Sequence, residues 1–145
     1  MTMTIRLAPS SATPLSRSQT RVLLLDDDSF QLDLLSELLK NLGFNDLTCA
    51  TGSAEALRKI ASTPKGFDLL LIDLHLPGED GFHFMEGLAK VDYKGALIIV
   101  SGQSQDVMRG AALVAKLRRF TLLGTLTKPV ERAALAVLIR GLSQP

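Results

Sequence analysis

Short runs of apolar residues recur along the chain, and each ends at a polar residue or a turn. Three runs are apolar at nearly every position, which is typical of strands buried on both faces of a sheet. They cover residues 22–25, 69–72 and 96–100. A weaker strand is predicted at 47–50, because Asn45 and Asp46 precede it, and a last strand at 122–126.

Between these runs, apolar residues recur at helical spacing. In the first helix the predicted buried stripe consists of Leu34, Leu35, Leu38, Leu39 and Leu42. We expect Ser29 to cap its N-terminus and Gly43 to end it. A second helix is expected to begin at Ser53 and to end before Pro64 and Gly66. Three further helices are predicted over residues 81–91, 105–118 and 131–142.

Strands that alternate with helices predict right-handed βαβ units and a parallel sheet covered on both faces. Five of each in a chain of this size predict an α/β fold, the flavodoxin-like (βα)5 three-layer sandwich. Its five-stranded parallel sheet is expected in the order 2-1-3-4-5. In such sheets, functional residues gather at the carboxyl ends of the strands.

The composition supports one globular domain and excludes some partners. Of the 145 residues, 46% are apolar and 21% charged, which is unlike a disordered chain. The 16 basic and 15 acidic residues nearly cancel, so no overall field favours direct nucleic-acid or membrane binding. We expect a flexible leader over residues 1–20, which resembles no signal peptide, and one domain over 21–145.

A single cysteine and the absence of long apolar runs indicate the compartment. Cys49 has no second cysteine with which to form an intramolecular disulfide or a cysteine metal site, which fits a reducing cytoplasm. No stretch of the sequence approaches the roughly twenty apolar residues that cross a bilayer. The predicted location is therefore the cytoplasm.

Polar residues of particular kinds follow four of the predicted strands. Asp26 and Asp27 follow the first strand, Asp73 the third and Ser101 the fourth, and Lys128 comes soon after the fifth. The strand order 2-1-3-4-5 would bring all of them to one pocket. Close carboxylates repel one another by about 4 kcal/mol per pair at an effective dielectric near 20, so they need a cation.

Mg²⁺ suits such a set of hard oxygen ligands, particularly when a phosphate oxygen completes it. A carboxylate can also attack phosphorus to form an aspartyl phosphate, and a metal and a lysine can stabilise that transfer. The residues at the strand ends therefore contain the components of a phosphoaspartate switch.

The strings VLLLDDDS, LLLIDLHLPGEDGF, IIVSG and LTKP, in this order, resemble the signature of response-regulator receiver domains of two-component systems. The resemblance covers about residues 20–142. It implies that Asp73 is the phosphoacceptor. It also implies that Asp26 and Asp27 hold Mg²⁺ together with Asp73 and the backbone carbonyl of His75.

The same resemblance implies that Ser101 is the switch hydroxyl and that Lys128 contacts the phosphoryl group. The family usually has a cis peptide before the next proline, so we expect one at Lys128–Pro129. The implied phosphodonor is a histidine kinase or a phosphotransfer protein, with the signal leaving through the fourth helix, the last strand and the last helix. The implied recipient is an output domain or a partner protein, and a homodimer is the expected assembly if the chain self-associates. The implied role is signalling rather than enzymatic turnover, although receivers can catalyse their own phosphorylation and dephosphorylation.

Two departures from the family pattern affect the switch. Thr125 stands where the family commonly has an aromatic residue, three positions before the lysine. The segment from Ser101 to Lys128 is longer than in compact receivers and carries basic residues at 116, 118 and 119. The string LLGTLTKPV, with SGQ upstream, resembles receivers joined to EAL-type cyclic-di-GMP phosphodiesterase outputs.

Other interpretations remain for several residues. Asp28 is interpreted as a helix-start residue, Cys49 as a small buried side chain and His83 as a surface residue. A haloacid-dehalogenase-like phosphatase would need a second aspartate at the position of His75. We expect the His75 side chain to face solvent beside the pocket. There, together with Gln103, it could affect how water reaches the phosphoryl group. A pseudo-receiver that acts by protein–protein contact without phosphorylation is the other alternative.

Overall fold

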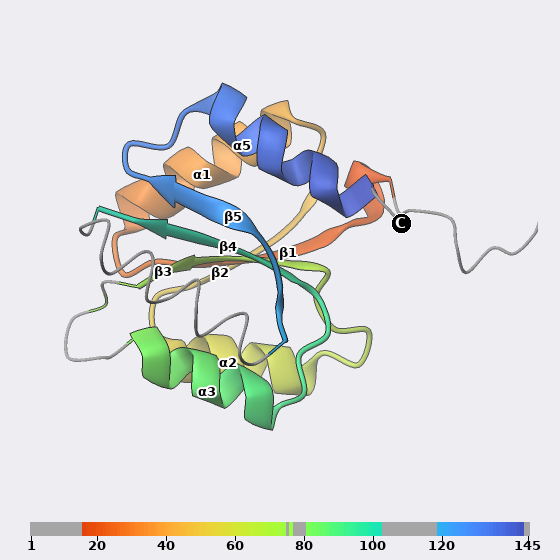
Figure 1. Cartoon of the computed structure of the whole chain (residues 1–145), viewed down its shortest axis with the longest axis vertical. Helices are drawn as coiled ribbons and strands as arrows, with labels where there is room; N and C mark the ends of the chain where they lie inside the picture. Colours follow the sequence, from red (N-terminus) through yellow and green to blue (C-terminus); the bar gives the residue numbers. More distant parts are fainter. Residues whose placement is uncertain (1–15, 75, 77–80, 103–118, 144–145) are drawn as a thin grey trace, which may run out of the picture.

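A five-stranded parallel sheet forms the centre of the protein, with helices on both faces (Figure 1). The structure is a computed structural model that describes residues 16–74, 76, 81–102 and 119–143. The strands are β1 (Arg21–Leu25), β2 (Asp46–Ala50), β3 (Leu69–Asp73), β4 (Ala96–Ser101) and β5 (Thr121–Thr127). The helices are η3 (Arg17–Gln19), α1 (Ser29–Asn41), α2 (Ser53–Ser62), α3 (Gly81–Lys90), α5 (Arg132–Ile139) and η4 (Arg140–Ser143).

The strand order is β2-β1-β3-β4-β5 and every pair is parallel, as predicted. Leu25 pairs with Ile72, and Asp73 pairs with Val100. The carboxyl ends of the central strands therefore lie close to one level. This register places the residue that follows β1 beside the last residue of β3, at the carboxyl ends of the strands.

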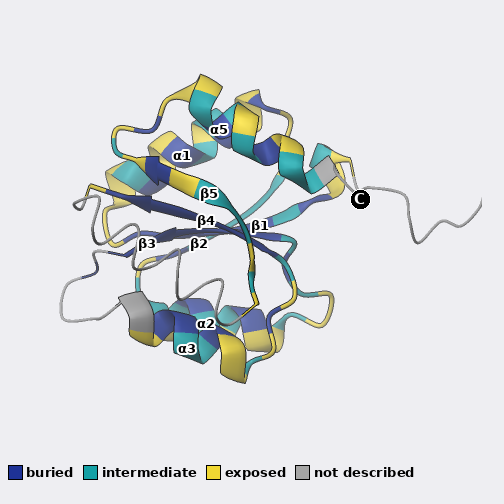
Figure 2. Ribbon diagram, in the orientation of Figure 1, coloured by how far each residue is buried: buried dark blue, intermediate teal, exposed yellow. Residues whose placement is uncertain are grey.

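The central strands are buried on both faces because their alternate side chains enter two different hydrophobic clusters. Val22 and Leu24 pack toward α1 and α5, whereas Leu23 and Leu25 pack toward α2 and α3. All five residues of β3 and all six of β4 are buried, which explains the continuous apolar runs in the sequence. Figure 2 shows the buried central strands between helices whose outer surfaces are exposed.

The first helix corrects two sequence predictions. Its N-cap is Asp28, whose carboxylate accepts the Phe30 N–H at 2.9 Å, and Ser29 is the first helical residue. Leu34, predicted to be buried, is 38% exposed, and Leu32 is buried instead. The predicted stripe was misplaced at its N-terminal end, because a run of adjacent leucines does not by itself define the centre of the buried face.

The remaining boundaries agree with the predictions to within a few residues. The last helix is divided, since α5 ends at Ile139 and a 3-10 turn follows. Gly43 has a φ of 102° directly after the C-cap of α1, as a helix-ending glycine requires. The helix predicted over residues 105–118 lies outside the described residues. Within the described part of the chain, no helix is long and apolar enough to cross a membrane.

Part of the predicted leader contacts the domain. Arg17 in η3 donates a 2.7 Å hydrogen bond to the Leu42 carbonyl, and its guanidinium lies 5.9 Å from the centre of the Phe44 ring. Thr20 is 3% exposed. These contacts attach residues 17–20 to the end of α1.

Candidate functional site

Three aspartates meet at the carboxyl ends of β1 and β3. Asp26 and Asp27 follow β1, Asp73 ends β3, and one carboxylate oxygen from each lies within 4.8 Å of the others. Asp26 is 1% exposed and Asp73 is 3% exposed, whereas Asp27 is exposed to solvent. The predicted convergence of these residues is therefore observed, with two buried carboxylates and one at the surface.

Lys128 joins the two buried carboxylates. Its Nζ lies 2.7 Å from Asp26 Oδ2 and 3.1 Å from Asp73 Oδ2, and its side chain is 21% exposed. Burial alone would lower the pKa of Lys128, but the hydrogen bonds to Asp26 and Asp73 outweigh burial and raise this pKa above its usual value. The lysine is accordingly held in its charged form between the two aspartates.

Backbone contacts fix the positions of these side chains. The Asp26 N–H donates to the Ala50 carbonyl at 3.1 Å, and Asp26 Oδ1 accepts the Asp28 N–H at 2.9 Å. The Lys128 N–H donates to the Ser101 carbonyl at 3.1 Å. The Lys128–Pro129 peptide is cis, as predicted. Sequence reasoning missed the Ala50 contact, because the contact depends on the register of β2 against β1 and not on the strand order alone.

The other predicted residues fall into three groups. Ser101 ends β4 and is fully buried, beside the site. His75 and Gln103 lie outside the described residues. Asp28 caps α1, and His83 is exposed, both as interpreted from the sequence. Cys49 is only partly buried and packs against the cluster formed with α1 and α5.

The ligand chemistry at the three aspartates fits Mg²⁺. All the donors are carboxylate oxygens, which are hard ligands, and one of the carboxylates remains open to water. Three carboxylates face the single ammonium of Lys128 among the described residues, so the cluster has an excess of negative charge. A divalent cation would neutralise that excess.

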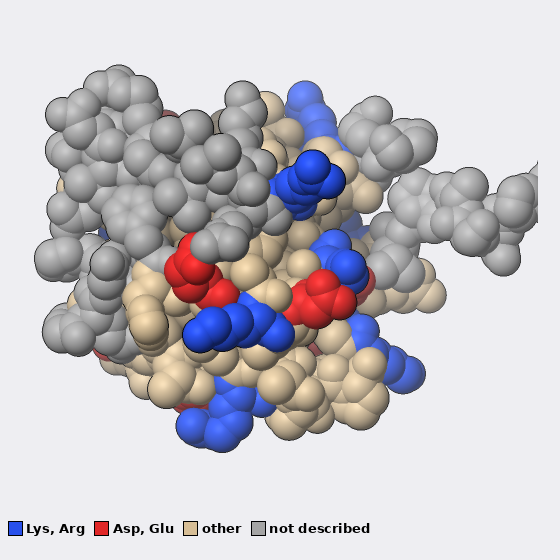
Figure 3. Space-filling view, turned by 60° about the horizontal axis from the view of Figure 1, so that its bottom comes forward, with Lys and Arg blue, Asp and Glu red and all other residues tan. Residues whose placement is uncertain are grey.

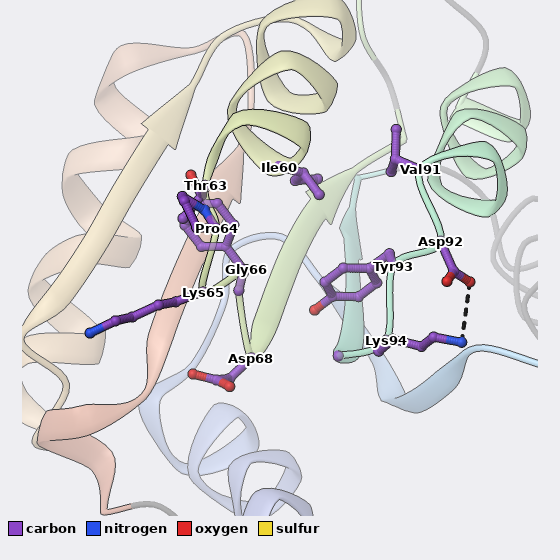
Figure 4. A pocket seen from close by; sticks show the side chains of 12 residues that line it. Ile60, Thr63, Pro64, Lys65, Gly66, Asp68, Val91, Asp92, Tyr93 and Lys94 are labelled. Carbon is purple, nitrogen blue, oxygen red and sulfur yellow. Dashed lines mark ion pairs between the residues drawn. The ribbon is translucent and has the colours of Figure 1, made fainter.

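A separate cavity of about 390 Å³ lies at the amino ends of the strands, between the loops that precede β3 and β4 (Figure 4). Pro64 and Tyr93 lie on opposite sides of it, and an ion pair of 3.2 Å joins Asp92 to Lys94. The Tyr93 hydroxyl donates to the Ala96 carbonyl at 2.8 Å. None of the site residues lines this cavity, so it is not part of the acidic cluster.

The charges on the surface are mixed. On the face shown in Figure 3, Lys and Arg side chains lie between Asp and Glu side chains and uncharged residues. This distribution agrees with the near balance of 16 basic and 15 acidic residues in the sequence.

The sheet order and the position of the acidic cluster define a doubly wound α/β domain of the flavodoxin-like type, with its site at the switch point between β1 and β3. Residues 22–140 match the response regulator receiver domain family, and the chain belongs to this family. The family resemblance found in the sequence motifs is thereby confirmed.

Individual relatives agree with this assignment. The chain is 33% identical over 91 residues to the two-component response regulator ARR11 of Arabidopsis thaliana, which covers 62% of this chain and 17% of that protein. It is 35% identical over 92 residues to ORR24 of Oryza sativa subsp. indica, covering 62% of this chain and 14% of the relative. The chain thus spans less than a fifth of the length of these curated relatives.

Solved structures show the same fold. A response regulator from Colwellia psychrerythraea superposes with a TM-score of 0.73 at 27% identity, covering 87% of this chain and 98% of the other. The CheX–CheY–BeF3–Mg complex of Borrelia burgdorferi gives a TM-score of 0.74 at 20% identity, covering 87% and 90% of the two chains.

Proposed function

We propose that this chain is a phosphoacceptor domain that receives a phosphoryl group on Asp73 from a histidine kinase or a phosphotransfer protein. The observation that carries the proposal is the cluster of Asp26, Asp27 and Asp73 within 4.8 Å, with Lys128 bonded to both buried members. Membership of the receiver family supports the same role.

Asp26, Asp27 and Asp73 are the side chains that would hold Mg²⁺, and the family resemblance adds the backbone carbonyl of His75. When bound, Mg²⁺ supplies positive charge that offsets the repulsion between the carboxylates and an incoming phosphoryl group. Because Asp27 is exposed while Asp26 is buried, the solvent side of the cluster is where the donor would approach.

Asp73 acts as the nucleophile. One of its carboxylate oxygens forms the new P–O bond as the P–N bond to the donor histidine breaks, and the histidine nitrogen keeps the electron pair of that bond. Lys128 moves its hydrogen bond from the carboxylate to the phosphoryl oxygens, and the Ser101 hydroxyl at the neighbouring strand end donates to another. The resulting acyl phosphate is the signalling state.

The signal would leave through the face formed by the fourth helix, β5 and α5. Thr125 in β5 is exposed and is not aromatic, so the usual inward rotation of a ring is not the relay here. The fourth helix, predicted over residues 105–118, lies outside the described residues. The string LLGTLTKPV supports an EAL-type output, and a partner protein is the alternative recipient. The single cysteine supports a cytoplasmic location.

The proposal is tested by incubating the chain with Mg²⁺ and a small acyl-phosphate donor, followed by intact-mass measurement. We expect one added phosphoryl group per chain, its loss with Asp73→Asn, and no reaction in the presence of a chelator. No modification, or modification that persists in Asp73→Asn, would contradict the proposal.

A pseudo-receiver is the second candidate, and the observation in its favour is the exposed Thr125. Such a domain would bind its partner equally well whether or not Asp73 is phosphorylated or complexed with beryllofluoride. A partner-binding assay with and without beryllofluoride therefore separates the two candidates.

A further inference from the structure

The metal ligand Asp26 depends on the end of the neighbouring edge strand, β2. Its N–H donates to the Ala50 carbonyl at 3.1 Å. That carbonyl belongs to the same peptide group as the Thr51 N–H, which donates to Glu55 Oε1 at 2.9 Å. Asp26 and Glu55 therefore hold the two ends of one planar peptide.

Lys59 binds the outer side of β2 and also pairs with Glu55. Because β2 lies at the sheet edge and the Ala50 carbonyl faces β1, the preceding carbonyl of Cys49 faces away from the sheet. Lys59 Nζ donates to that carbonyl at 2.7 Å and lies 3.0 Å from Glu55 Oε2. One ion pair on α2 thus fixes the peptide groups on both sides of Ala50.

The charge of Glu55 is favoured by the same contacts. The hydrogen bond from the Thr51 N–H, followed by that from Lys59, lowers the pKa of Glu55. The carboxylate is therefore the form that holds the peptide. Exposed ion pairs four residues apart contribute little stability by themselves, so the backbone contacts distinguish this pair from an ordinary surface pair.

We propose that Glu55 and Lys59 are positioning residues for the Mg²⁺ ligand Asp26, acting through the peptide groups that flank Ala50. This inference rests on the proposed function, because it assigns the pair a role in the same metal site. The contacts of Glu55 and Lys59 reach Asp26 through the backbone of β2. Their effect is to set the direction of the Ala50 carbonyl, and through it the position of the Asp26 backbone.

The experiment uses the full chain labelled with ¹⁵N and compares three variants with the wild type. Glu55→Ala removes the acceptor for the Thr51 N–H, Glu55→Gln keeps an acceptor but loses the ion pair, and Lys59→Met removes the bond to Cys49. Glu37→Ala is the matched control, because Glu37 pairs with Lys40 on α1 at 3.9 Å and both are exposed. The readouts are the Mg²⁺ dissociation constant and the amide signal of Asp26 without metal.

Substituting a residue that bonds directly to a metal ligand typically changes the metal affinity by about 10- to 100-fold. Glu55 is one hydrogen bond further from the ligand, so we expect Glu55→Ala to weaken Mg²⁺ binding by about three- to tenfold. Glu55→Gln should weaken it less, because the amide oxygen still accepts the Thr51 N–H. Glu37→Ala should leave the dissociation constant and the Asp26 signal unchanged.

Unchanged Mg²⁺ binding and an unchanged Asp26 amide signal in Glu55→Ala would overturn the inference. An equal loss of affinity in Glu37→Ala would also overturn it, since the effect would then reflect general destabilisation. If the wild type bound no Mg²⁺, the proposed function would fail. The Asp26 amide signal in the metal-free variants would still support or refute the mechanical link to Glu55.

Discussion

Replacing Lys128 with methionine would remove a charge from the centre of the acidic cluster while keeping an unbranched side chain. Asp26 and Asp73, whose side chains are 1% and 4% exposed, would then lose the ammonium group that lies between them. At an effective dielectric near 20, two carboxylates within 4.8 Å repel by at least about 3.5 kcal/mol. Breaking a buried ion pair by removing one partner typically destabilises by about 3–5 kcal/mol.

We therefore expect Lys128→Met to lower the free energy of unfolding of the metal-free protein by about 3 kcal/mol. The measurement is urea denaturation with a chelator and again with saturating Mg²⁺. Because a divalent cation would replace the missing charge, the difference from the wild type should shrink in Mg²⁺. Mg²⁺ should thus stabilise the variant more than it stabilises the wild type.

Lys40→Met is the matched control, since Lys40 is 59% exposed and its pair with Glu37 measures 3.9 Å. An exposed pair contributes about 0–1 kcal/mol, so this variant should remain close to the wild type. The reasoning would be refuted if Lys128→Met lost less than the control, or if its loss were the same with and without Mg²⁺.

Three further outcomes follow from the described contacts. Leu71→Ala, at a side chain 1% exposed in the middle of β3, should lower the free energy of unfolding by about 3 kcal/mol in chemical denaturation. Asp28→Ala should lower it by about 1 kcal/mol through loss of the α1 cap, and Ser29→Ala should change it much less. The pKa of Lys128 is higher in the folded protein than in the unfolded chain. The stability that charged Lys128 contributes is therefore fully present below the usual lysine pKa, and it is lost as the pH rises through the pKa of Lys128 in the folded protein. Unfolding measured from pH 9 to 12 should therefore show a loss in the wild type that Lys128→Met lacks.

The sheet and the acidic cluster were predictable because their signals are local and strong. The run from Leu69 to Ile72 is apolar at every position since β3 is buried on both faces, and its end at Asp73 follows directly. Strand order then brings Asp26 and Lys128 to Asp73, and this order was expected because it is the usual one for five-stranded flavodoxin-like sheets. The site residues were thus accessible from the sequence before any contact was known.

The details that sequence could not supply depend on contacts between elements. The exposure of Leu34 follows from how α1 is rotated against β1 and β3, and several adjacent leucines fit more than one rotation. The link from Glu55 to Asp26 passes through a strand with only a weak apolar pattern. A Glu–Lys pair four residues apart on a helix usually indicates a solvated surface, so it carried no signal for the site.

The cavity between the loops before β3 and β4 lies at the end of the sheet that carries none of the site residues. Pro64 and Lys65 in its wall are both exposed. Since the three aspartates and Lys128 all come from the other end of the strands, this end is suited to genetic insertion. A reporter domain spliced between Pro64 and Lys65 would therefore label the protein while leaving the acidic cluster covalently undisturbed.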